Sequence, residues 1–433
     1  MNTLYRNDAP GEFPGSWYRA TAEIPPPRPK LDGDARADVC VVGAGYTGLS
    51  AALELARRGF SVIVLDAHRA GFGASGRNGG QVSSGFNKDQ RWIRDRVGGN
   101  AAQVLWDMGE AAKEQVRRHA KTHAPEARYT PGVAHGAYTR AQADELAREA
   151  EHLAKVHNYH AVETLDHDAM RAMVKTPRYT GGTLDWGAGH IHPLRYALGL
   201  ARAAEVAGAL IYEMTEATGV EDKTPARVQT PTGTVTADHI ILAGNGYMPD
   251  LHPRVAARVM PINSFIAATE PLDDPRSILA QDIAVADSKF VVNYYRMSED
   301  GRFLFGGRES YAIGFPKDIE TALVRRMTRL FPQLEGVELS HVWGGTLGIT
   351  MTRLPMVARV GQSILNASGF SGHGVALSGF AGTVMAEAIA GQAERFDILG
   401  TLPVPVFPGG AALRAPLLTL AMTWFALRDR LGL

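Results

Sequence analysis

The sequence predicts an α/β protein in which a Rossmann-like dinucleotide-binding domain is interleaved with an α+β domain built on an antiparallel sheet. A strand, glycine turn, helix and strand over residues 38–66 predict the first half of a dinucleotide-binding fold. Two further strands that end in glycine turns are predicted near residues 246 and 369, and the sequence pattern of residues 258–350 between them predicts antiparallel strands. A chain of 433 residues also exceeds one compact module and fits two domains.

The first unit consists of the strand 38–42 and the turn Gly43-Ala44-Gly45-Tyr46-Thr47-Gly48. Apolar residues at helical spacing then predict a helix over 47–58, and the next strand, 61–65, ends at Asp66. Glycines at this spacing let a pyrophosphate approach the helix N-terminus. An acidic residue after the second strand accepts hydrogen bonds from ribose hydroxyls and disfavours a 2′-phosphate. The alternative is a βα turn that binds no nucleotide.

The later elements follow from periodicity and from turn residues. The glycine-rich stretch 71–85 predicts no regular element, and Pro193 is typical of the first position of a helix. The other expected elements are helices over 88–123, 140–157, 193–208 and 375–390, strands over 240–242 and 364–367, and a hairpin of 290–296 and 302–306 around residues 298–301.

These elements divide the chain into interleaved parts. A Pro-rich lead-in precedes the first strand, and residues 415–427 form an apolar stretch that is too short to span a bilayer, which takes about 20 residues. We expect this stretch to be a docked amphipathic helix, with a weak contact to a membrane surface as the alternative. The expected parts are a lead-in at 1–37, a dinucleotide-binding domain at 38–90, 189–250 and 351–400, a substrate domain at 91–188 and 251–350, and a C-terminal segment at 401–433.

Composition excludes several classes of function. The 45 basic and 45 acidic residues cancel, which argues against a nucleic-acid-binding protein, because phosphate contacts need an excess of Lys and Arg. Cys40 is the single cysteine, so an intramolecular disulfide and a cysteine-based metal site are excluded. The first residues lack the apolar core of a secretory signal, and we predict no transmembrane segment. We therefore expect a cytoplasmic protein, and its oligomeric state is open.

The interruption of the dinucleotide-binding fold resembles the FAD-dependent oxidoreductases of the D-amino-acid-oxidase (DAO) type, whereas the glycine fingerprint alone is shared by FAD and NAD. Three segments look like the gamma-glutamylputrescine oxidase branch of that family: GASGRNGGQ (73–81), GHIHPLRYALGLARAA (189–204) and GFSGHGVALSGFAG (369–382). The resemblance runs from about residue 16 onward. It implies FAD as the cofactor, a glutathione-reductase-like FAD-binding domain and a substrate domain.

The resemblance also implies which residues hold FAD. Arg77 has an alternative role as a salt-bridge partner that orders its loop, and His373 has one as a hydrogen-bonded structural residue. The implied set is Gly43, Ala44, Gly45, Tyr46, Thr47, Gly48, Asp66 and Ala67 for the ADP half; Gly73, Ala74, Ser75, Arg77, Asn78, Gly79 and Gly80 along the pyrophosphate, ribityl chain and flavin edge; Ala217, Ala243 and Gly244 near the adenine and nucleotide; and Gly372, His373, Gly374 and Val375 at the flavin pyrimidine.

The FAD is predicted to be noncovalent and the protein to hold no metal. Relatives that attach flavin use a cysteine in the stretch comparable to 341–355 or a histidine in the stretch comparable to 71–81, and this sequence has neither. Cys40 lies in the first strand and is predicted to be an inert core thiol. His190 and His192 are spaced as metal ligands, but no further Cys, His or Asp cluster accompanies them, so we predict cap or packing roles.

The resemblance implies oxidation of the C–N bond of a small-molecule amine, such as gamma-glutamylputrescine, to an aldehyde and ammonia, with oxygen reduced to peroxide. Alternatives are an N-methyl amino-acid oxidase, a dehydrogenase that uses another acceptor, and a flavin-binding protein without turnover. The dehydrogenase alternative arises because RFLFGGR (302–308) lacks the lysine that sarcosine-oxidase relatives place over the flavin. The candidates for the amine pocket are Tyr294, Tyr295, Arg308, Trp343 and His373, and ordinary sheet packing is the alternative for each side chain on the sheet.

Overall fold

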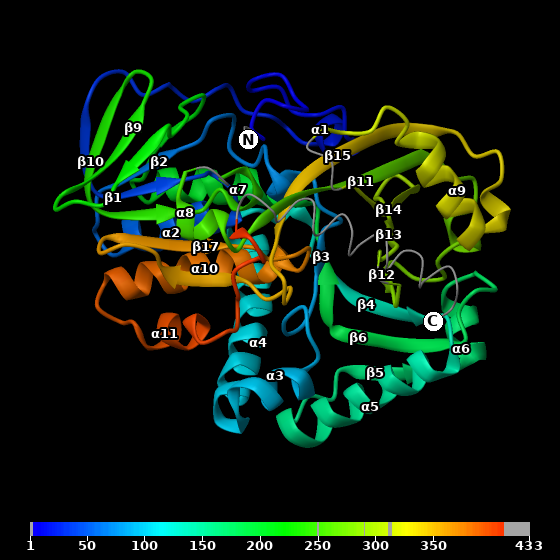
Figure 1. Ribbon diagram of the computed structural model, residues 1–433. Coiled ribbons are helices and arrows are strands. Elements are labelled where there is room, and N and C mark those ends of the chain that lie inside the picture. The colour runs from blue at the N-terminus through cyan, green and yellow to red at the C-terminus, as the bar shows by residue number, and fades with distance from the viewer. Residues whose placement is uncertain (1–2, 249–250, 290, 311–313, 411–433) are drawn as a thin grey trace.

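The computed structural model describes residues 3–248, 251–289, 291–310 and 314–410, and within these the chain forms two sheets (Figure 1). The first sheet has five parallel strands in the order β17-β10-β1-β2-β7, with β16 antiparallel at one edge and the β8–β9 hairpin on β10. The strands are β1 (Ala35–Val42), β2 (Val62–Leu65), β7 (Leu210–Tyr212), β8 (Gly219–Glu221), β9 (Ala226–Thr230), β10 (Gly233–Leu242), β16 (Met356–Arg359) and β17 (Ile364–Ser368).

The second sheet is almost entirely antiparallel, with the order β15-β11-β14-β13-β12-β4-β6-β3 and with β5 paired to β6. Only the β12–β4 pair in this described sheet is parallel. The strands are β3 (Gln81–Val82), β4 (Thr130–Ala137), β5 (Val162–Leu165), β6 (Gly181–His190), β11 (Met260–Pro271), β12 (Ala284–Asp287), β13 (Tyr294–Met297), β14 (Arg302–Ser310) and β15 (Leu339–Ile349). The predicted α/β fold class, with an antiparallel second unit, is confirmed.

Helices cover both units. Helices α2, α4, α7 and α10 belong to the apolar core of the first unit, while α5 packs on the second sheet and so does α9, at the right of Figure 1. The bounds are α1 (Trp17–Thr21), α2 (Tyr46–Arg57), α3 (Gln90–Val97), α4 (Gly99–His123), α5 (Arg140–His157), α6 (His167–Met173), α7 (Pro193–Val206), α8 (Pro253–Ala256), α9 (Glu320–Leu330), α10 (Gly374–Ile389) and α11 (Glu394–Gly400).

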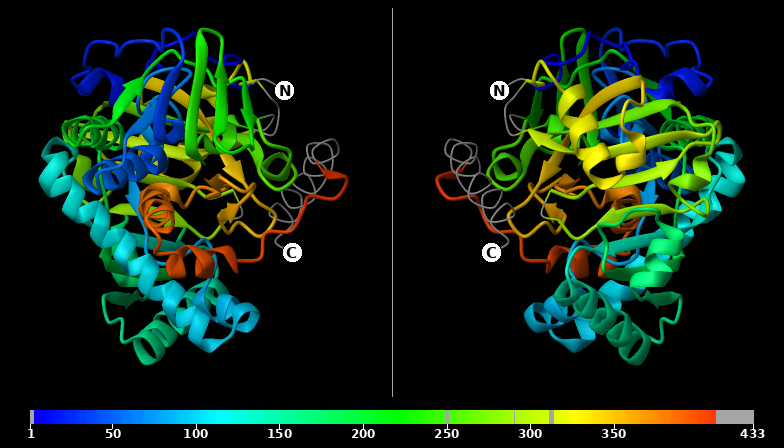
Figure 2. Two further views of the ribbon diagram at one scale, coloured as in Figure 1. Left: turned by 90° about the vertical axis from the view of Figure 1, so that its left-hand side faces the viewer. Right: turned by 90° about the vertical axis from the view of Figure 1, so that its right-hand side faces the viewer.

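The expected helix over 88–123 is wrong as one continuous element. Gly98 has φ +85°, a left-handed conformation that ends α3 before α4 begins at Gly99. Figure 2 shows α3 and α5 together at the lower end of the molecule. The stretch 71–85 also contains a short 3₁₀ turn (Ala74–Gly76) and β3, so the expectation of no regular element there is wrong in part.

The core has one apolar cluster on each side of the first sheet and one within the second unit. Leu105 and Val116 of α4 belong to the same cluster as Val39 and Val41 of β1, although the expected boundaries assign residues 91–188 to the substrate domain. The domain boundaries therefore stay a prediction. No helix in the described residues is both long and apolar enough to cross a membrane, and the expected apolar helix over 415–427 lies outside those residues.

Candidate functional site

A cavity of about 1060 Å³ is lined from both sheets. The first unit contributes the β1–α2 turn, the end of β2, the turn after β10 and the start of α10. The second contributes Ile262 and Ser264 of β11, Tyr294 of β13 and Leu347 of β15. The cavity therefore lies at the carboxyl ends of β1, β2 and β10, where open α/β sheets bind their ligands.

The glycines of the first turn are required by close backbone contacts. Gly43 has φ +109°, and a Cβ there would lie 2.9 Å from the carbonyl carbon of Ala243. A Cβ on Gly48 would lie 1.9 Å from the oxygen of Gly43, and one on Gly45 would lie 2.8 Å from Ser75 Oγ. Larger residues at these positions would push α2 away from β1 and fill the space beside the turn, so the helix N-terminus stays open toward the cavity.

Asp66 stands after β2 and holds the same turn. Its Oδ2 accepts a hydrogen bond from Ala44 N at 2.7 Å, and its Oδ1 accepts one from His68 N at 2.8 Å. Burial raises the pKa of Asp66 to about 6, against the effect of these two hydrogen bonds. Because Asp66 lines the cavity at a strand end, its position fits a ribose hydroxyl.

The loop after residue 72 is folded by its own side chains. Asn78 Nδ2 donates to the carbonyls of Ala74 and Ser75, both at 3.0 Å, and Asn78 Oδ1 accepts from Gly80 N at 2.7 Å. This arrangement turns the loop toward the cavity. All of the cofactor residues predicted from the sequence line the cavity except Ala44, Gly48 and Gly80.

Arg77 orders its loop and also lines the cavity. Its Nη1 pairs with Asp8 at 2.9 Å, and its Nε donates to the carbonyl of Phe72 at 2.7 Å. Its Nη2 is buried and has no hydrogen-bond partner among the described residues, although Arg77 lines the cavity. A buried donor without a partner costs about 1–3 kcal/mol, so this group fits a site whose ligand supplies an acceptor.

His373 lies where the glycine-rich segment before α10 meets the cavity. Its Nε2 donates to the carbonyl of Ser84 at 3.2 Å. Burial lowers the pKa of His373 to about 4, so the imidazole is neutral at pH 7. Gly372, Gly374 and Val375 beside it also line the cavity, which places the N-terminus of the 16-residue helix α10 at its wall. The backbone there favours negative charge without any charged side chain.

The four sheet candidates lie in different places. Tyr294 lines the cavity, with its hydroxyl 3.2 Å from Ser264 Oγ. Tyr295 points to the opposite face and donates to the hydroxyl of Tyr179 at 2.9 Å within the core of the second unit. Trp343 is buried beside the cavity without lining it, and its Nε1 donates to the carbonyl of Arg77 at 3.0 Å. Neither Tyr295 nor Trp343 is a pocket residue, because alternation and packing turn both side chains into the core.

Arg308 lies on β14, opposite Phe265 of β11, and its side chain is outside the described part of the structure. Sequence reasoning missed several lining residues that come from separate segments. Lys88 lies just after the glycine-rich stretch 71–85, and this position could have indicated a cavity residue. No local sequence pattern indicates that the other residues line the cavity. These residues are Thr3, Leu4, His68, Lys88, His135, Ser264, Glu309 and Arg353.

His190 and His192 make separate contacts in the structure. His192 Nδ1 accepts from Arg195 N at 3.2 Å and caps α7, as predicted, and its Nε2 contacts Thr21 Oγ1 at 3.0 Å. His190 Nε2 lies 3.3 Å from Asp282 instead. No group of three or more His, Cys, Asp or Glu in the described ranges is arranged to hold a metal ion.

The fold and cavity define a two-domain oxidoreductase of the kind that binds a dinucleotide at a Rossmann-like sheet and its substrate against an antiparallel one. The residues fit FAD, since a glycine cradle, Asp66 and Arg77 line one cavity, and the Nη2 of Arg77 has no hydrogen-bond partner within the described ranges. Residues 38–388 match the DAO family model, described as FAD dependent oxidoreductase. The chain belongs to this family and is an FAD-dependent oxidoreductase.

Two curated relatives cover nearly the whole chain. The chain is 40% identical over 424 residues to the gamma-glutamylputrescine oxidoreductase of Escherichia coli (strain K12), covering 97% of this chain and 99% of the relative. It is 42% identical over 416 residues to the probable oxidoreductase OrdL of Rhizobium meliloti (strain 1021), covering 96% and 97% respectively.

Solved structures share the fold at lower identity. The glycine oxidase of Geobacillus kaustophilus aligns with a TM-score of 0.69 at 21% identity, over 83% of this chain and 95% of that chain. The L-proline dehydrogenase of P. horikoshii aligns with a TM-score of 0.70 at 19% identity, over 85% and 96%. These likenesses confirm the predicted two-unit flavoprotein fold.

Proposed function

We propose that the protein oxidises the C–N bond of a primary aliphatic amine that carries a distant carboxylate, with gamma-glutamylputrescine as the substrate. The near-full-length likeness to the E. coli gamma-glutamylputrescine oxidoreductase carries this proposal. The cavity supports this proposal, because its lining includes the aromatic ring of Tyr294 and the cationic side chains of Lys88 and Arg353.

Bound FAD supplies an acceptor for two electrons, taken from the amine carbon as a hydride, and the resulting imine reacts with water to give an aldehyde and ammonia. Oxygen is the proposed final acceptor and becomes hydrogen peroxide. The residues that would hold FAD are those already named on the β1–α2 turn, the 73–79 loop and the start of α10, which line the cavity. The N-terminus of α10 would favour negative charge on the bound FAD, while neutral His373 fixes the cavity wall through the carbonyl of Ser84.

Tyr294 is the proposed contact for the methylene chain of the substrate. Its half-buried ring packs against Gly79 and Gly306, where a Cβ would lie 2.8 Å and 2.1 Å from ring atoms. Burial raises the pKa of its hydroxyl, so it stays protonated and can only share a neutral hydrogen bond with Ser264. A neutral aromatic wall suits an aliphatic chain, and it attracts an ammonium group through the ring face.

Lys88 and Arg353 are the proposed partners of the distant carboxylate, in place of Arg308. Both are half-buried and line the same cavity as Tyr294. Burial lowers the pKa of Lys88, and the charge of Arg353 lowers it further, so the two cations are close enough to repel each other. An anion between them would relieve that repulsion and form charge-assisted hydrogen bonds.

We also propose that FAD is held noncovalently and that the protein works in the cytoplasm. Cys40 is buried in β1, and burial raises the pKa of its thiol, so it is not an attaching nucleophile. His68 lines the cavity, but both its ring nitrogens are already hydrogen-bonded, to Gly11 N and to the carbonyl of Leu4. A chain with a single, buried thiol fits a reducing compartment.

The test is anaerobic bleaching of the protein-bound flavin, followed by assays for aldehyde and ammonia. Gamma-glutamylputrescine should bleach it fastest and putrescine more slowly. Rapid bleaching by sarcosine with gamma-glutamylputrescine inert would move the protein to N-methyl amino acids. Bleaching that oxygen does not reverse would indicate a dehydrogenase with another acceptor. No bleaching by any amine would leave a flavin-binding protein without turnover.

A further inference from the structure

We propose that residues 3–11 form a strap that closes the nucleotide end of the FAD cavity and sets the rate at which FAD leaves the protein. Thr3 and Leu4 line the cavity together with Asp66, Thr215 and Ala217. Asp66 marks the ribose end of such a site, so the strap lies on the nucleotide side and away from Tyr294. The inference rests on the proposed noncovalent binding of FAD.

The first anchor of the strap is His68, which holds it at two points. Gly11 N donates to His68 Nδ1 at 3.0 Å, and His68 Nε2 donates to the carbonyl of Leu4 at 2.8 Å. The ring is stacked on Phe72, with 3.7 Å between centroids and an interplanar angle of 4°. Its backbone N–H is bound to Asp66. One imidazole therefore joins the strap directly to the acidic residue of the dinucleotide-binding motif.

Two further side chains of the strap reach opposite parts of the first unit. Asp8 pairs with Arg77, whose side chain is only 1% exposed and belongs to the loop that lines the cavity. Tyr5 donates its hydroxyl to Glu216 Oε2 at 2.9 Å, beside Ala217. The strap thus spans from the 73–79 loop to the segment after β7, which crosses the nucleotide end of the cavity.

The packing lets the strap open as a unit. Tyr5 is 37% exposed, and hydrogen bonds and an ion pair anchor the strap at His68, Glu216 and Arg77. Trp17 and Tyr18, a few residues further on, are 2% and 0% exposed in a cluster with Leu194 and Trp343. Segments held by few buried apolar contacts open at lower free energy than the core, so the strap can swing away while α1 stays in place.

The experiment measures the first-order rate of FAD release after dilution of the holoprotein, from the rise in FAD fluorescence. Deletion of residues 2–7 removes the cover but keeps Asp8 on Arg77. We expect it to raise the release rate by about ten-fold or more. Gly11→Pro removes the N–H donated to His68 and, because Gly11 has φ +75°, also changes the backbone of the strap at that point, so it should also accelerate release.

The matched control is Glu23→Gln, an exposed change in the same lead-in outside the strap, and it should leave the rate unaltered. Release rates within about two-fold of the full chain for both strap variants would overturn the strap alone. Flavin that precipitates with the full chain in acid would overturn both the strap and the noncovalent site, so the two failures are distinguishable.

Discussion

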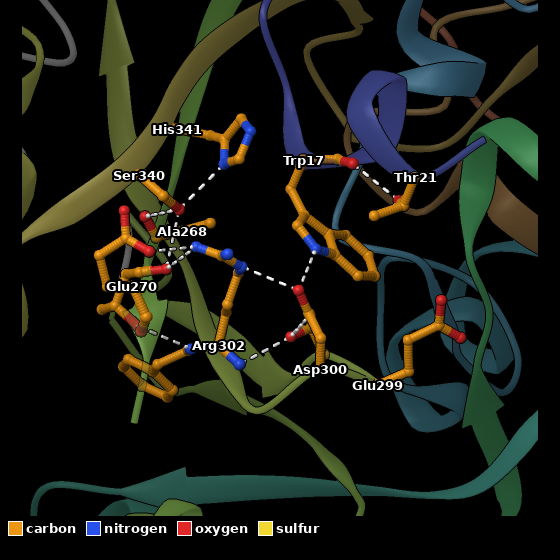
Figure 3. Close-up of polar contacts among 12 residues, drawn as sticks. Trp17, Thr21, Ala268, Glu270, Glu299, Asp300, Arg302, Ser340 and His341 are labelled. Atoms are coloured by element: carbon orange, nitrogen blue, oxygen red, sulfur yellow. Dashed lines mark hydrogen bonds and ion pairs between the residues drawn. The ribbon is translucent and has the colours of Figure 1, made fainter. Parts of the chain in front are cut away.

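Trp17 Nε1 donates a hydrogen bond to Asp300 Oδ2 at 3.2 Å, and this contact joins the lead-in helix α1 to the turn between β13 and β14 (Figure 3). Asp300 also accepts from Ser298 Oγ at 2.6 Å and from Arg302 Nε at 2.8 Å. Gly301, with φ +78°, completes the predicted hairpin turn. The lead-in is therefore fastened to the antiparallel sheet as well as to the dinucleotide-binding unit.

Asp300→Ala should lower the free energy of unfolding by about 1–2 kcal/mol, because three hydrogen bonds to a charged group are lost at a partly exposed site. Urea unfolding of the apoprotein measures the change. The control is Asp273→Ala. This change removes an exposed carboxylate next to Leu272, whose N–H donates to the carbonyl of Gly301 in the same hairpin. Equal stability of the two variants would mean that the turn does not depend on Asp300.

Gly45→Val should abolish FAD retention, whereas Asp66→Ala should only weaken it. A Cβ at Gly45 would lie 2.8 Å from Ser75 Oγ, which accepts from Tyr46 N at 3.0 Å, so valine disrupts the turn itself. Loss of Asp66 removes hydrogen bonds to a charged acceptor, each about 1.5–3 kcal/mol. The measurement is the flavin-to-protein absorbance ratio after desalting. A folded Gly45→Val protein with full flavin would contradict the proposed site.

Tyr294→Ala should lower kcat/KM for the amine by about ten-fold or more, since the cavity loses its aromatic wall. Tyr295→Phe is the matched control on the same strand. It removes only the hydrogen bond to Tyr179 in the core and should cost about 1 kcal/mol of stability with kcat/KM unchanged. Steady-state kinetics and thermal unfolding of both variants separate the roles. A larger kinetic loss for Tyr295→Phe would reverse the assignment.

Lys88→Met and Arg353→Met should each lower kcat/KM for gamma-glutamylputrescine by about ten-fold, because a charge-assisted contact to its carboxylate is lost. Putrescine has no carboxylate, so its kcat/KM should stay within about two-fold of the unmodified protein. The ratio of the two values is the measurement. Equal losses of kcat/KM for both amines would mean that Lys88 and Arg353 maintain the shape of the cavity and do not bind the carboxylate.

The stability of the apoprotein should fall as the pH decreases from about 6.5 toward 4, in part because of His373. In the unfolded chain, His373 takes up a proton near pH 6.5, whereas in the folded chain it stays neutral until about pH 4. The stabilisation from neutral His373 is therefore complete above pH 6.5 and is lost as the pH falls from 6.5 to about 4. The expected contribution is about 3 kcal/mol. Urea unfolding at several pH values, compared with His373→Gln, isolates it. An identical pH dependence in both proteins would contradict a buried neutral imidazole.

The parts of the site that could be predicted from the sequence are those coded by neighbouring residues. Gly43, Gly45 and Asp66 belong to one βαβ unit, so their meeting follows from strand and helix geometry alone. Alternation predicts that only one of Tyr294 and Tyr295 faces the cavity, but the register of the sheet decides which one. Trp343 is bulky enough for either role, and only packing turns it onto the backbone of Arg77.

The remaining lining residues could not be predicted because the tertiary fold alone brings them to the cavity. Thr3 and Leu4 lie in a polar segment without periodicity, yet they reach the end of β2. Lys88 and Arg353 are far apart in the sequence, yet both line the cavity. The glycine at position 98 did not predict the break between α3 and α4, because its left-handed conformation depends on how these two helices pack on their surroundings.

The chain passes back and forth between the two sheets, since β1 and β2 belong to the first, β3 to β6 to the second, β7 to β10 to the first, β11 to β15 to the second, and β16 and β17 to the first. β17 lies beside β10 and leads directly to the wall at Gly374. On the ribosome, the FAD site therefore stays open on one side until residue 375 has emerged from the exit tunnel. Cofactor loading must follow translation of that residue, and a nascent chain stalled earlier should not capture FAD.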